Sequence, residues 1–96
     1  MGSISIDQRL PGAEIVAKGC DDLAAGVLSE EALLVAGAAP RLRSLGLEVA
    51  AVEVESPLHR LYELLAADSD DPHARYNALV RRVVSFARAA EHAASG

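Results

Sequence analysis

Cysteine and aromatic residues are scarce in this chain, and each scarcity excludes a class of structure. Cys20 is the only cysteine, so the chain can form no internal disulfide and has no set of thiols that would hold a structural metal ion. Tryptophan is absent, and the aromatic residues are Tyr62, Tyr76 and Phe86. A core with few large side chains gains less free energy per buried residue, so its elements must pack closely or bury further surface between subunits.

Long uncharged apolar runs are also missing. The longest, residues 32–40, is about half as long as a membrane-spanning helix requires. Near the start of the chain, Asp7, Gln8 and Arg9 stand where a secretory signal would have its apolar segment. We therefore expect a soluble, cytoplasmic protein without a membrane partner.

The apolar content that is present consists mostly of alanine, leucine and valine, and it makes up 51% of the 96 residues. Such a composition favours helices over sheets and is sufficient for one packed core. We predict an all-α fold, a compact single-domain bundle of four to five helices over residues 1–96, with a long amphipathic C-terminal helix. Residues 1–10 are expected to be flexible or partly extended.

The last quarter of the chain, residues 71–94, predicts that long helix. Asp71 and Pro72 form a cap-and-proline start signal. One arc at the helical period is apolar and comprises Tyr76, Leu79, Val80, Val83, Phe86, Ala87 and Ala90. The opposite arc carries Arg75, Arg81, Arg82, Arg88 and His92.

A first helix is expected after Pro11 and Gly12, ending near Leu28. Its buried face would hold Ile15, Val16, Cys20, Leu23, Ala24 and Val27. Gly19 and Gly26 lie on its flank, where glycine lowers helix stability, so a close contact with another helix would have to offset that cost.

Ser29 is a good N-cap for a second helix, with Glu30 and Glu31 in the first turn. Residues 32–39 then have no polar face, so this helix is expected to be either the central element of the fold or the seam between subunits. Pro40 should end or kink it near residues 37–39, and a further turn or two of helix should follow and close at Gly46.

Residues 47–55 (LEVAAVEVE) are the one stretch that leans away from helix. We expect an extended loop over the helices, with strand pairing to residues 4–6 or to a second copy as the alternatives. Ser56 and Pro57 then begin another helix, which runs to about Ala67 with a buried stripe of Leu58, Leu61, Tyr62 and Leu65.

Charge is unevenly distributed along the chain. Residues 1–71 contain 5 basic and 13 acidic side chains, a net −8, whereas residues 72–96 contain four arginines and Glu91, a net +3. The arginines are expected to pair with acidic groups of the same or a neighbouring subunit. A nucleic-acid role for them is the alternative, and the overall net charge of −5 weighs against it.

No set of residues has the spacing of a catalytic or metal site. The acidic segment 68–73 (DSDDPH) lacks the pattern of a calcium-binding loop, and capping explains Asp71. The histidines His59, His73 and His92 point to no shared site, and nucleotide, hydrolase and metalloprotease motifs are absent. Cys20 is read as a small buried hydrophobe with a raised thiol pKa. We predict no catalytic residue, no metal and no cofactor.

These observations favour a non-enzymatic helical protein-interaction module that associates with itself, as a homodimer. The residues singled out for binding are Arg60, Arg75, Tyr76, Arg81, Arg82 and Arg88. One alternative is a small nucleic-acid-binding regulator that uses the arginine face of the last helix. Another is a small-molecule-binding or catalytic domain near His59, Arg60, Tyr62 and Tyr76.

Overall fold

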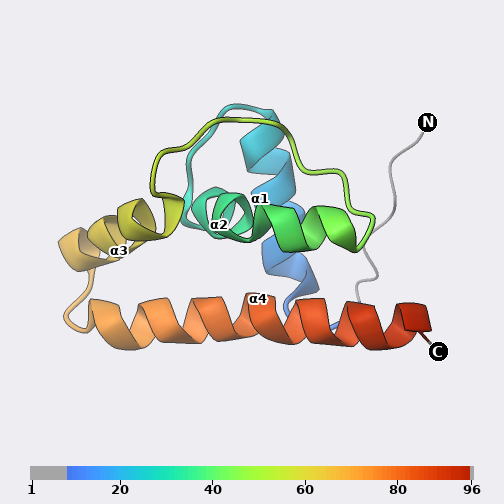
Figure 1. Cartoon of the computed structure of the whole chain (residues 1–96). Coiled ribbons are helices and arrows are strands. Elements are labelled where there is room, and N and C mark those ends of the chain that lie inside the picture. The colour runs from blue at the N-terminus through green and yellow to red at the C-terminus, as the bar shows by residue number, and fades with distance from the viewer. Residues whose placement is uncertain (1–8, 96) are drawn as a thin grey trace.

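Four helices make up the fold of the computed structural model, which describes residues 9–95. In chain order they are α1 (Ala13–Ala24), α2 (Glu30–Ser44), α3 (Pro57–Asp68) and α4 (Pro72–Ser95). Figure 1 shows α4 running along one side of the molecule, with the other three helices packed over it. The described residues contain no strand, so the all-helical, compact fold is confirmed, with a radius of gyration of 13.1 Å. The expectation for the start of the chain falls mostly on residues outside the described range.

α2 is the central element. It contacts α1, α3 and α4, whereas α1 and α3 do not touch each other within residues 9–95. Its first two turns contribute four consecutive buried side chains, namely Ala32, Leu33, Leu34 and Val35. The helix that has no polar face is therefore enclosed by its own chain. Of the two roles expected for it, the structure assigns the central one.

Pro40 does not end α2. The helix is continuous from Glu30 to Ser44, and Figure 1 shows its first turns almost end-on and its later turns across the view, so its direction changes along its length. Proline removes one N–H from the helical ladder and crowds the carbonyl of the residue four positions earlier, which bends a helix. Pro40 itself is exposed, but Leu42 beyond it is fully buried, and this burial holds the second half of α2 on the core.

α1 ends at Ala24 rather than near Leu28. Gly26 adopts a left-handed backbone with φ 78°, in which the Val27 N–H donates to the Asp22 carbonyl at 2.8 Å and the Gly26 N–H to the Leu23 carbonyl at 3.1 Å. This is the hydrogen-bond pattern of a glycine-terminated helix. Val27, which the helical pattern places on the buried face, consequently lies in a loop and is exposed.

Gly19 lies where α1 and α2 pack most closely. A Cβ atom at this position would overlap the Glu31 carbonyl and the side chain of Val35. The close contact expected to offset the cost of a helical glycine is therefore confirmed for Gly19. The same expectation is wrong for Gly26, because a Cβ atom there would meet no other atom within 4 Å.

The connection between α2 and α3 is an extended loop, as expected. It arches from the end of α2 back to the start of α3 (Figure 1), and no strand forms in it. Val49 is buried, and the Arg43 guanidinium donates to the carbonyls of Val49 and Ala50, both at 3.2 Å. These contacts hold the loop against the helices. The alternative pairing with residues 4–6 lies outside the described residues.

The starts of α3 and α4 differ from each other. The Asp71 carboxylate accepts a hydrogen bond from the Ala74 N–H at 3.1 Å, so the predicted cap of α4 is confirmed. Ser56 precedes α3 as expected, but its backbone is left-handed with φ 47° and its side chain makes no capping bond. A capping side chain acts from an extended backbone, and the turn before Pro57 does not allow that geometry.

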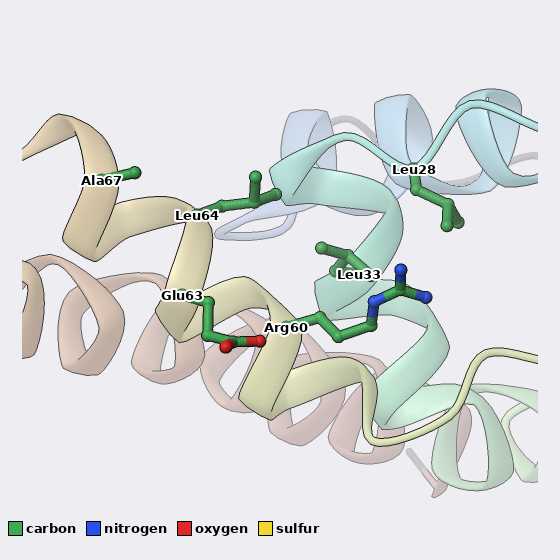
Figure 2. A pocket seen from close by; sticks show the side chains of 6 residues that line it. All are labelled: Leu28, Leu33, Arg60, Glu63, Leu64 and Ala67. Carbon is green, nitrogen blue, oxygen red and sulfur yellow. The ribbon is translucent and has the colours of Figure 1, made fainter.

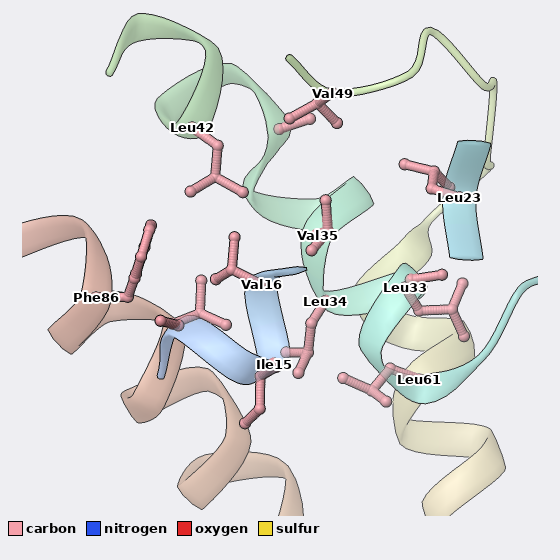
Figure 3. Packing of buried hydrophobic residues seen from close by; sticks show 14 of the residues in the cluster. Ile15, Val16, Leu23, Leu33, Leu34, Val35, Leu42, Val49, Leu61 and Phe86 are labelled. Carbon is pink, nitrogen blue, oxygen red and sulfur yellow. The ribbon is translucent and has the colours of Figure 1, made fainter. Parts of the chain in front are cut away.

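One hydrophobic core joins the four helices (Figure 3). From α4 it receives Val83, Phe86 and Ala87, all of which are buried, while Tyr76, Leu79, Val80 and Ala90 pack at its edge. Phe86 is 1% exposed and is the largest fully buried side chain. The arginines of α4 are exposed. The buried residues of α3 are Leu61 and Leu65.

Candidate functional site

A groove lies between α3 and the corner where α1 meets α2. We call it the α3 groove, and it has a volume of about 380 Å³. Figure 2 shows α3 forming one side of it and the start of α2 with its preceding loop forming the other. Its lining residues are Leu28, Leu33, Arg60, Glu63, Leu64 and Ala67.

Apolar side chains dominate this groove and its edge. Leu33 is 2% exposed and forms the floor, whereas Leu64 is 43% and Leu28 38% exposed. Val27, beside Leu28, is 50% exposed. Large apolar groups gathered at one place on a small protein, rather than scattered singly, are typical of an interaction surface.

Two opposite charges flank the groove on α3. Arg60 and Glu63 rise from successive turns, and in Figure 2 the Arg60 side chain extends from α3 towards α2. Arg60 makes no ion pair with the residues of the described part of the chain, and Glu63 has only His59, whose Nε2 lies 3.8 Å from a carboxylate oxygen. Both charges are therefore available to a molecule that enters the groove.

Two of the four α4 arginines are paired within the chain. Arg75 donates to Glu30 of α2 at 3.4 Å, and Arg82 donates to Glu14 of α1. Arg81 and Arg88 have no partner among residues 9–95. The expectation that the arginines face acidic groups of the same subunit is confirmed for Arg75 and Arg82. The remaining two do not form a continuous cationic stripe with them.

Arg81 and Arg82 also border a second groove, where the start of α1 meets α4. Its volume is about 450 Å³, and it is lined by Leu10, Pro11, Gly12, Glu14, Ala78, Arg81, Arg82 and Ser85. The ion pair between Glu14 and Arg82 lies within it. An anion entering there would compete with the Glu14 carboxylate, so this groove is a poorer candidate than the α3 groove.

The aromatic candidates lie elsewhere. Tyr62 and Tyr76 meet edge to face between α3 and α4, with ring centroids 5.6 Å apart. The four residues considered for a small-molecule or catalytic site are thereby divided. Arg60 lines the α3 groove, the tyrosines join two helices, and the His59 side chain is 73% exposed to solvent. The structure brings Tyr62 and Tyr76 together but does not gather the set around one cavity.

Cys20 is half-buried rather than buried. Desolvation raises the pKa of its thiol, and the neighbouring Asp21 carboxylate adds to the effect. The raised pKa was expected from the sequence, and it keeps the group in its weakly nucleophilic thiol form. Among the described residues, no cluster of His, Cys, Asp and Glu side chains is arranged to hold a metal ion.

Comparison with protein-family models, with curated proteins and with solved structures finds no match for this chain. Within residues 9–95, no helix combines the length and the apolar character that crossing a bilayer requires. The function of the protein must therefore be argued from its own surface.

Sequence reasoning missed most of the α3 groove. It singles out Arg60 but expects Leu28 at the end of the first helix, because the helical period continues through Gly26. Leu64 is an apolar residue outside the buried stripe that contains Leu61 and Leu65, and the sequence analysis gives it no role. A leucine that no buried stripe accounts for was the signal that could have pointed to this surface.

Proposed function

We propose that this protein is a non-enzymatic interaction module that associates with itself through the α3 groove. The observation that carries the proposal is the pair of exposed leucines, Leu28 and Leu64, that line that groove. Each Å² of apolar surface removed from water on association contributes about 25 cal/mol. The chain has few large side chains to bury, so leaving two exposed leucines at one surface without a partner would be a costly arrangement.

The position of α2 directs the proposal to this groove. The apolar helix was one candidate for the seam between subunits, but its apolar residues 32–35 are buried within the chain, where α2 contacts α1, α3 and α4. Leu28 and Leu64 are exposed leucines that this packing leaves uncovered at one groove.

Size-exclusion chromatography with light scattering on wild type and two variants tests the proposal. Leu64→Glu places a charge in the α3 groove and should shift the protein to the monomer, weakening the dimer by roughly tenfold or more, because a charge buried at an interface is left unpaired. Val52→Glu is the matched control, since Val52 is 40% exposed and lies outside this groove. A dimer equally insensitive to both substitutions would contradict the proposal.

A nucleic-acid-binding regulator is the second candidate. It is favoured by Arg81 and Arg88, which lie two turns apart on α4, exposed and without a partner among residues 9–95. Backbone phosphates are bound by such side chains. Binding to a duplex DNA at low salt, lost on raising the salt and on changing both arginines to alanine, would support it. Failure to bind at low salt would eliminate it.

A further inference from the structure

We infer that the occupant of the α3 groove is a second copy of the chain, docked about a two-fold axis so that Arg60 of each copy pairs with Glu63 of the other. This inference rests on the proposed function and adds the geometry of the interface. It follows from how charge and apolar surface are arranged on one face of α3.

The spacing of these residues places them together. Residues 60, 63, 64 and 67 follow the helical period, so Arg60, Glu63, Leu64 and Ala67 form one stripe along α3. The stripe is exposed, because the buried residues Leu61 and Leu65 point into the core on the adjacent face. A helix packed against this stripe would meet a cation, an anion and a leucine within two turns.

The two charges are uncommitted within the chain. Arg60 has no ion-pair partner in the described residues, and Glu63 is 3.8 Å from an exposed histidine that carries charge only when protonated. Other arginines of this protein do find carboxylates, as Arg41 does with Glu91 at 2.8 Å and Arg75 with Glu30. A partner that buries both groups leaves neither charge unpaired only if it supplies an anion opposite Arg60 and a cation opposite Glu63.

A second copy supplies both. In a two-fold symmetric dimer, residue i of the first copy contacts residue j of the second, and residue j of the first contacts residue i of the second. The same surface of both copies must therefore complement itself. Arg60 and Glu63 meet this condition, because an axis crossing α3 between them sets each guanidinium opposite the carboxylate of the second copy. Leu64, one residue beyond Glu63, then packs against the second copy within one turn of the axis. A partner with a single sign of charge would leave one of the two groups without a counter-ion.

Charge exchange tests this geometry. Arg60→Glu places two acidic pairs across the interface and Glu63→Arg places two basic pairs, so each variant alone should dimerise roughly tenfold or more weakly than wild type. The double variant Arg60→Glu/Glu63→Arg restores both opposite pairs and should dimerise as wild type does. Mixing the two single variants should also restore dimerisation, as a heterodimer that carries one copy of each.

Sedimentation velocity on the separate and mixed variants reads out these states. Arg88→Glu and Glu53→Arg are the matched controls, since they make the same changes in net charge at exposed positions outside the groove, and they should leave the dimer unchanged. Single variants that dimerise normally, or a mixture that stays monomeric, would overturn the inference. If Leu64→Glu still breaks a wild-type dimer, the proposed function survives that result; if wild type is itself monomeric, the proposed function fails as well.

Discussion

The Ser29 hydroxyl donates a hydrogen bond to the Asp22 carboxylate at 2.6 Å while it accepts one from the Ala32 N–H at 3.1 Å. One side chain thus caps the start of α2 and ties it to the last turns of α1. Asp22 also accepts from Lys18 at 2.6 Å. This network fixes the corner between the two helices, which carries Val27 and Leu28 and forms one wall of the α3 groove.

Ser29→Ala should destabilise the fold by about 1 kcal/mol or somewhat more, because it removes the cap of α2. Ser56→Ala is the matched control. Both serines precede a helix, but the Ser56 side chain makes no capping bond, so its loss should change stability by less than about 0.5 kcal/mol. Urea unfolding followed by circular dichroism measures both. Equal effects of the two substitutions would show that the Ser29 cap contributes nothing specific.

Asp22 should make stability depend on acid pH. Its pKa is lowered by the hydrogen bonds from Lys18 and Ser29. A carboxyl whose pKa is lower in the folded than in the unfolded state stabilises the fold above its unfolded pKa of about 3.9, and this stabilisation is lost as pH falls through the folded pKa. Wild type should therefore be more stable than Asp22→Asn near neutral pH. The difference should shrink towards zero as pH drops below about 4.

Thermal unfolding of wild type and Asp22→Asn from neutral to acid pH checks this expectation. Lys18 adds a second dependence at alkaline pH, because its pKa is raised, chiefly by its hydrogen bond to Asp22. Its contribution is present below the unfolded lysine pKa and is lost as pH rises through the folded value. A stability difference that stayed constant down to the lowest pH would mean that Asp22 is not held by these partners.

Gly19→Ala should destabilise the protein, whereas Gly37→Ala should be close to neutral. Alanine at either helical position gains about 1 kcal/mol of intrinsic preference. At Gly19, however, the new Cβ meets the Glu31 carbonyl, which cannot move without separating α1 from α2, and overpacking of this kind costs about 1 to 3 kcal/mol. At Gly37 it meets no backbone atom but lies 2.6 Å from Cγ and Cδ2 of the half-buried Leu58, so that side chain must shift and its displacement offsets the gain. Chemical unfolding of both variants compares them, and equal stability would contradict the close packing of α1 on α2.

Cys20 should react slowly with a thiol-alkylating reagent in the folded protein. Burial raises its pKa, so a smaller fraction is thiolate at mildly alkaline pH, and the reaction rate should keep rising with pH beyond the range of a free thiol. The protein unfolded in urea provides the reference rate. A folded rate equal to the unfolded one would place the thiol in solvent.

Much of the fold was predictable because local signals agreed with tertiary packing. Asp71 and Pro72 begin α4, Ser29 caps α2, and Gly46 follows its end, each where backbone chemistry requires that residue type. The wrong predictions concern places where two signals conflicted. At Gly26 the apolar period continues past a helix terminator, and at Ser56 a capping residue stands in a left-handed backbone that allows no capping bond. At Pro40 the expected kink occurs rather than an end, because the burial of Leu42 holds the rest of α2 on the core.

The candidate site was less predictable than the fold. Which arginine finds a carboxylate depends on residues far apart in the chain, such as Arg82 with Glu14 and Arg75 with Glu30. The α3 groove likewise joins Leu28 to Leu64, which are brought together only once α2 has packed against α3. Periodicity within one helix identifies its buried face, but it does not reveal which exposed apolar side chains of different elements become neighbours.

Sedimentation equilibrium of the unmodified protein at micromolar concentration tests self-association most directly. The account predicts a mass that rises with concentration from that of the 10.0 kDa chain towards twice that value. A mass that stayed at the monomer value over the whole range would contradict it.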